Sequence, residues 1–68
     1  MSATIRINGR EETLTAVTVA ELLAARGIAG SRGLAVAVNG MVVPAGAWRE
    51  RSLNAGDDVE IVRPFGGG

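Results

Sequence analysis

The sequence predicts an α+β domain in which one main helix packs on one face of a mixed sheet of four to five strands. Two Asn-Gly pairs, each between two segments with strand character, predict two β-hairpins. One amphipathic segment between these hairpins suits a helix, and a last alternating segment adds another strand. The order is therefore β-β-α-β-β-β, for which a two-layer arrangement is the stable solution.

The first hairpin occupies the beginning of the chain. Residues 4–8 alternate polar and apolar side chains, as is typical of a half-buried strand. The Asn-Gly pair at 8–9 favours a type I′ turn, because both residues tolerate a positive φ. We expect the returning strand over residues 12–15, with Leu14 facing the core.

The helix begins at a capping box with the sequence TVAE, residues 18–21. In this motif the Thr18 hydroxyl accepts from the N–H of Glu21, and the Glu21 carboxylate reaches back to the N–H of Thr18. Val17 is placed to pack on the first helical turn as a hydrophobic staple. The apolar spacing predicts a helix over residues 19–26, with Arg26 near the negative end of its dipole.

The second half of the chain predicts three more strands. Residues 34–38 are a continuous apolar stretch, the second Asn-Gly pair makes a turn, and residues 41–43 return. Residues 45–51 contain the one Trp and show no clear period. Residues 58–63 alternate and form the last strand, which can lie beside the first strand, parallel to it, in the centre of the sheet.

The inward positions of these elements predict the hydrophobic core. Burial of one such side chain contributes about 1.5–3 kcal/mol. Together these contributions roughly balance the ordering entropy of so short a chain. The expected core residues are Ile5, Ile7, Leu14, Val17, Val19, Leu22, Leu23, Leu34, Val36, Val38, Val59 and Ile61.

The composition excludes several kinds of function. The 68 residues include no Cys and no His, which removes disulfides, Cys/His zinc sites, thiol catalysis and the most common general base. The formal net charge is zero, the Arg residues are scattered, and aromatic residues make up 3%, so a nucleic-acid surface is not indicated. The sequence contains no apolar run long enough to cross a membrane or to act as a signal peptide, and we expect a cytoplasmic protein.

A set of short motifs, in order along the whole chain, resembles the ThiS family, the ubiquitin-like sulfur carriers of thiamine biosynthesis. The resemblance implies a β-grasp fold, with a domain over residues 1–64 and a flexible Gly-rich tail over residues 65–68. Its motifs are Ala37-Val38-Asn39-Gly40, Val43-Pro44, Trp48, Leu53, Gly56-Asp57, Val59-Glu60-Ile61-Val62 and Gly67-Gly68.

The resemblance also implies a reaction cycle at the terminal carboxylate of Gly68, with Gly67 beside it. A ThiF-type adenylating enzyme uses ATP to form an acyl-adenylate. Sulfur from a cysteine desulfurase or another donor then gives a thiocarboxylate, which a ThiG-type thiazole synthase consumes. This chain is then a protein substrate with no bound cofactor and no metal. The family requires two terminal glycines, and whether the third, Gly66, is needed stays open.

The residues themselves indicate how such a tail is used. Glycine has no Cβ, so a glycine strip can enter a channel that excludes any side chain. If Val36 and Val38 face the helix, their neighbours on the same strand face away from it. An apolar patch near the tail is then the candidate surface for partners. The residues of this candidate surface are Ala35, Ala37, Val62, Phe65 and Gly66.

Several alternatives stay open at this point. The chain could be a carrier related to the small subunit of molybdopterin synthase, or a ubiquitin-like modifier. A different class is a non-catalytic β-grasp binding module, which a coding sequence continuing past Gly68 would favour. The acidic residues Asp57, Asp58 and Glu60 fit turn chemistry and a solvated strand face better than a metal site. For Trp48, packing is a better interpretation than a partner contact.

Overall fold

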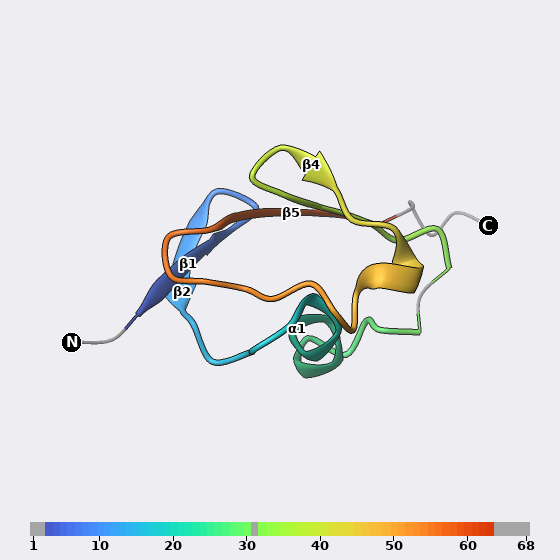
Figure 1. Cartoon of the computed structure of the whole chain (residues 1–68), viewed down its shortest axis with the longest axis horizontal. Helices are drawn as coiled ribbons and strands as arrows, with labels where there is room; N and C mark the ends of the chain where they lie inside the picture. Colours follow the sequence, from blue (N-terminus) through green and yellow to red (C-terminus); the bar gives the residue numbers. More distant parts are fainter. Residues whose placement is uncertain (1–2, 31, 64–68) are drawn as a thin grey trace.

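The computed structural model describes residues 3–30 and 32–63 of the chain. The described strands form one mixed sheet in the order β2-β1-β5-β3-β4, and α1 lies on one side of it (Figure 1). The predicted α+β class and order of elements are confirmed. The elements are β1 (Thr4–Ile7), β2 (Arg10–Thr13), α1 (Val19–Ala25), β3 (Ala35–Val38), β4 (Met41–Val42), the 3₁₀ helix η1 (Ala45–Ala47) and β5 (Asp58–Val62).

The last strand lies in the middle of the sheet, as predicted. β5 pairs in parallel with β1, where Ile7 lies opposite Val59. On its other side β5 pairs antiparallel with β3, where Val36 lies opposite Ile61. The strand that leads to the C-terminal residues is therefore held from both sides.

Both Asn-Gly pairs form the predicted turns. Asn8 and Asn39 each have a φ of 52°, and the glycine after each has a φ of 83°. These positive values match a type I′ turn. The prediction for the strand after the first turn was wrong by two residues, because a two-residue turn pairs Ile7 directly with Arg10. β2 therefore ends before Leu14, which is half-buried.

The helix starts at the predicted cap. The Thr18 hydroxyl accepts from the N–H of Glu21 at 3.2 Å, but the Glu21 carboxylate accepts from the N–H of Val17 at 3.0 Å rather than from that of Thr18. The helix ends one residue earlier than predicted, with Arg26 as its C-cap. The Arg26 guanidinium pairs with Glu12 of β2 at 3.1 Å, and both side chains are 37% exposed. An ion pair this exposed adds little to stability.

The core lies between α1 and the sheet. The prediction that Val17 belongs to the core was wrong, since its side chain is 63% exposed. The backbone of residues 17–19 pairs with that of residues 51–53, and in this pairing Leu53 is the buried side chain. Leu14 and Leu34 are only partly buried against it. The predicted residues that are buried are Ile5, Ile7, Val19, Leu22, Leu23, Val36, Val38, Val59 and Ile61. Those that were not predicted are Ile28, Val43 and Leu53.

The segment without a sequence period closes one end of the core. Trp48 follows η1, is half-buried and packs against the core cluster. Its indole Nε1 donates to the backbone carbonyl of Val43 at 2.9 Å. This contact agrees with the packing interpretation of Trp48. Within residues 3–30 and 32–63, no helix has the length and apolar character needed to cross a membrane.

Candidate functional site

The candidate site is the face of the sheet opposite α1, here called the outer face. Along β5, Val59 and Ile61 are buried toward the helix, whereas Asp58, Glu60 and Val62 are exposed on the other side. This alternation follows from the two-residue period of a strand. The outer face therefore carries the side chains that the packing of the core leaves available for contacts with other molecules.

One half of the outer face is apolar. Ala35 lies opposite Val62, and Ala37 lies opposite both Glu60 and Val42. Val62 is 62% exposed and Val42 is 75% exposed. Ala35, Ala37, Val42 and Val62 are hereafter the apolar patch. Two of these side chains belong to β3, and β4 and β5 contribute one each.

The patch joins three of the residues predicted from the sequence and adds one. Val42 was not predicted, although the alternation in its hairpin offered a signal, since the buried Val43 leaves its neighbour facing outward. Val62 is the last residue of β5, so the patch adjoins the strand end that leads toward the tail. The other predicted site residues, Phe65, Gly66, Gly67 and Gly68, lie outside the described residues.

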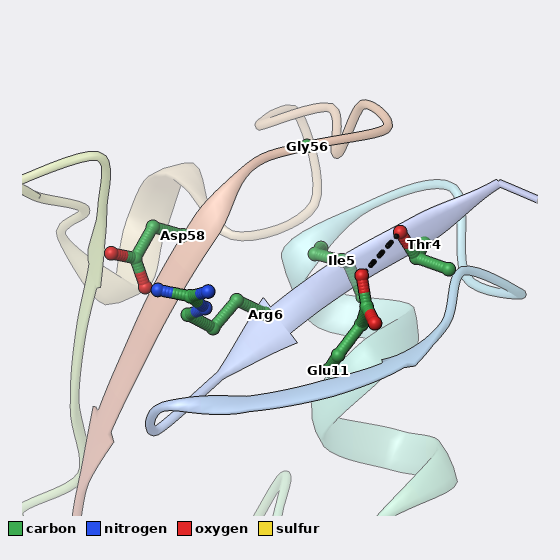
Figure 2. Close-up of a pocket in the computed structure, with 6 residues that line it drawn as sticks. All are labelled: Thr4, Ile5, Arg6, Glu11, Gly56 and Asp58. Carbon is green, nitrogen blue, oxygen red and sulfur yellow. Dashed lines mark hydrogen bonds between the residues drawn. The ribbon is translucent and has the colours of Figure 1, made fainter.

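The other half of the outer face is charged. Arg6 of β1 lies opposite Glu11 of β2 and next to Asp58 of β5 in the register of the sheet. Figure 2 shows the Arg6 guanidinium directed toward Asp58, with the Thr4 hydroxyl bonded to Glu11 at 3.2 Å. A shallow hollow of about 350 Å³ lies among these side chains. Its lining carries one guanidinium and two carboxylates, and it contains none of the predicted site residues.

The acidic turn before β5 has a structural role. Asp57 is only 9% exposed. One of its oxygens accepts from the N–H of Asn54 at 2.8 Å, and the other accepts from the side-chain amide of Asn39 at 3.0 Å. These bonds agree with the turn interpretation. Among residues 3–30 and 32–63, no group of three or more acidic side chains is arranged to hold a metal ion.

The sheet order, with the parallel first and last strands in the centre and a helix across one face, defines a ubiquitin-like β-grasp domain. The outer face adds an apolar patch beside the end of the last strand. The sequence matches the ThiS family model over residues 5–68, and the chain belongs to the ThiS family.

Solved structures agree with this family. The chain is similar to the crystal structure of a thiamine biosynthesis protein (ThiS) from Geobacter metallireducens, with a TM-score of 0.79 and 31% identity over 96% of this chain and 99% of that one. It is similar to an NMR solution structure of a thiamine biosynthesis protein from the same organism, with the same score and identity, over 96% of this chain and 87% of that one. A search of curated proteins found no significant match.

Proposed function

We propose that this chain is a sulfur carrier of thiamine biosynthesis, with the Gly68 carboxylate as its reacting group. The observation that carries the proposal is the family match, which runs through Gly67 and Gly68. The names of the similar structures, which are thiamine biosynthesis proteins, support the pathway. The related molybdopterin-type carriers and protein modifiers have no comparable support.

The first proposed step is adenylation by a ThiF-type partner that binds ATP. A carboxylate oxygen of Gly68 attacks the α-phosphorus of ATP, the α–β phosphoanhydride bond breaks, and pyrophosphate leaves. The product is a mixed anhydride between the carboxyl group and AMP. Because a carboxylate is a poor electrophile, this activation is what allows a later nucleophile to attack the carbonyl carbon.

The second proposed step introduces sulfur. Hydrosulfide attacks the carbonyl carbon of the adenylate, the carbon–oxygen bond to AMP breaks, and a thiocarboxylate remains. A persulfide from a cysteine desulfurase can supply the same sulfur atom if a thiol then reduces the S–S bond. A ThiG-type thiazole synthase is the proposed acceptor of the sulfur.

In this proposal the chain is a protein substrate rather than an enzyme. Its sequence has no His or Cys to act as a general base or nucleophile. The partner supplies the ATP site, and the chain needs no cofactor of its own. The ATP that the cycle consumes favours a cytoplasmic location. What the domain contributes is a rigid surface for recognition and a glycine strip that fits a narrow channel.

The apolar patch is the proposed surface for the adenylating partner. Exposed valines beside the reacting end are suited to a desolvated contact. Asp58 and Glu60 are exposed on the same face, so the opposing surface is expected to be apolar with a basic border. Phe65 and Gly66, which follow β5 in sequence, are proposed to extend this contact.

A genetic experiment tests the pathway. A bacterial strain that needs external thiazole because it lacks its own carrier is supplied with this chain. Growth without thiazole is expected for the full chain and not for a version without Gly67 and Gly68. A strain that lacks the small subunit of molybdopterin synthase serves as the comparison. Rescue of that strain alone would overturn the thiamine assignment.

A further inference from the structure

The two Asn-Gly turns bind β5 at opposite ends. Each asparagine has the same φ of 52°, and each uses its backbone N–H and both polar atoms of its side chain. Asn8 binds near the end of β5, at Val59 and Ile61. Asn39 binds at its start, at Asp57 and Asp58. The fold therefore contains two asparagine clamps, which differ in where they hold the strand and in one partner, a backbone carbonyl for Asn8 and a side-chain carboxylate for Asn39.

The Asn8 clamp extends the β1–β5 pairing beyond the last residue of β1. The backbone N–H of Asn8 donates to the Val59 carbonyl at 2.9 Å. The chain then turns away toward β2, and the next bonds to β5 are made by the Asn8 side chain. Its Oδ1 accepts from the N–H of Ile61 at 2.7 Å, and its Nδ2 donates to the Ile61 carbonyl at 3.2 Å. One side chain thus satisfies both backbone groups of Ile61.

The Asn39 clamp holds the other end of β5, and one of its partners is a side chain. Its backbone N–H donates to the Asp58 carbonyl at 2.7 Å. Its Oδ1 accepts from the N–H of Asp58 at 2.9 Å, and its Nδ2 donates to the Asp57 carboxylate at 3.0 Å. These bonds fix the turn that enters β5, away from the strand end that leads to Gly68.

We propose that Asn8 is a positioning residue for the tail, an inference that rests on the proposed function. Residues 64–68 follow the end of β5 in the sequence. Because the clamp holds both backbone groups of Ile61, this end of the strand is fixed on the domain, and we expect the Gly68 carboxylate to reach the partner's ATP site more often than from a strand end that opens. Without the clamp, the β1-facing edge of β5 opens locally at Ile61.

A positioning role for Asn8 should affect the rate of adenylation and leave the binding of the partner unchanged. Val62 pairs with Ala35 on the other edge of β5, and we expect this pairing to remain when Asn8 is changed. The apolar patch is then preserved, so the partner still recognises the domain. The loss is expected in kcat for adenylation, because delivery of the carboxylate depends on how firmly the end of β5 is held, while KM reports mainly the contact made by the patch.

The test compares Asn8→Gly with Asn39→Gly. Glycine keeps the positive φ of each turn and removes only the side chain, and Asn39→Gly is the matched control. Pyrophosphate release is measured with the adenylating partner, ATP and the full chain. For Asn8→Gly we expect kcat to fall about fivefold or more and KM to stay within about twofold. For Asn39→Gly we expect both values to stay within about twofold of those of the unchanged chain.

A second readout follows the clamp itself. Amide hydrogen exchange at Ile61 is expected to rise about tenfold in Asn8→Gly and to change little in Asn39→Gly. Asn8→Asp keeps the acceptor for the Ile61 N–H but loses the donor to the Ile61 carbonyl. Its kcat should lie between that of Asn8→Gly and that of Asn39→Gly. It also serves as the test variant if the glycine variant fails to fold.

Two results would overturn the positioning role. One is an unchanged kcat in a folded Asn8 variant whose Ile61 exchange has risen. The other is an equal loss of kcat in Asn39→Gly, which would indicate a general effect of stability. If the unchanged chain itself released no pyrophosphate with its adenylating partner, the proposed function would be wrong. That result differs from a loss seen only in the Asn8 variants, which concerns the positioning role alone.

Discussion

Ala35 and Val62 lie directly opposite each other in the antiparallel pair of β3 and β5, and both are exposed on the outer face. This pair places an apolar surface beside the strand end that leads to Gly68. A partner that binds this surface would contact the domain beside the strand end after which the proposed reacting residue follows in the sequence. The first prediction below tests that surface.

A charge in the apolar patch should weaken recognition by the adenylating partner. Val62→Glu and Ala37→Lys are expected to raise KM for pyrophosphate release about tenfold, because the new charge must lose its water in an apolar contact. Lysine is chosen at position 37 because Glu60 lies opposite Ala37, and an acidic side chain at position 37 would be repelled by Glu60. Thr13→Glu, at the far edge of the same face, is the control.

Unfolding in urea should show that Val62→Glu and Thr13→Glu remain as stable as the unchanged chain to within about 0.5 kcal/mol, as is usual for exposed positions. Ala37 is half-buried, so the same measurement must show that Ala37→Lys remains folded. If folded Val62→Glu and Ala37→Lys keep their KM, or if Thr13→Glu raises it equally, the apolar patch is not the docking surface.

Asp57 should be needed for stability because of its bonds rather than its charge. Asp57→Ala removes the acceptor for the N–H of Asn54 and the amide of Asn39. Leaving such donors without a partner costs about 1–3 kcal/mol in the free energy of unfolding, which urea titration measures. The neighbouring Asp58→Ala changes an exposed side chain and should cost much less. Equal losses would contradict this account.

The indole of Trp48 should contribute through one hydrogen bond as well as through packing. Trp48→Phe keeps an aromatic ring but loses the bond to the Val43 carbonyl. A loss of about 1 kcal/mol is expected, which lowers Tm by about 4–8 °C in a domain of this size. Thermal unfolding followed by circular dichroism measures it. An unchanged Tm would show that the bond is replaced by water.

Leu23 and Val17 should differ sharply in their effect on folding. Leu23 is fully buried, and Leu23→Ala is expected to cost about 2–5 kcal/mol through lost contacts and the cavity it leaves. Val17 is 63% exposed, so Val17→Ala should stay within about 0.5 kcal/mol. Both free energies of unfolding come from urea titration. A large loss of unfolding free energy in Val17→Ala would indicate that Val17 does act as the hydrophobic staple predicted from the sequence.

The sequence was most informative where local chemistry decides the structure. The Asn-Gly turns and the Thr18 cap depend on a few neighbouring residues, and both were predicted at the right positions. Leu53 was missed because it lies in an irregular segment, where no period indicates which side chain faces inward. Val43 was missed because residues 41–43 are all apolar, so their sequence does not show which of them is buried. Their burial follows from long-range packing, which a local pattern does not contain.

The candidate site was likewise predicted where local alternation decides it and missed where distant residues meet. The alternation along β3 and β5 was enough to place Ala35, Ala37 and Val62 on the outer face. The clamp of Asn8 on Ile61 joins residues that are distant in the sequence. Only the parallel pairing of β1 and β5 brings them together, so the turn motif alone could not reveal the contact.

The most direct test of the carrier function is the intact mass of the chain after reaction. The full chain is incubated with ATP, sulfide and its adenylating partner, and a version without Gly67 and Gly68 is treated identically. We expect the full chain to gain the mass difference between one sulfur and one oxygen atom, and the shortened version to remain unchanged. No gain in the full chain, or the same gain in both, would contradict a thiocarboxylate formed at Gly68.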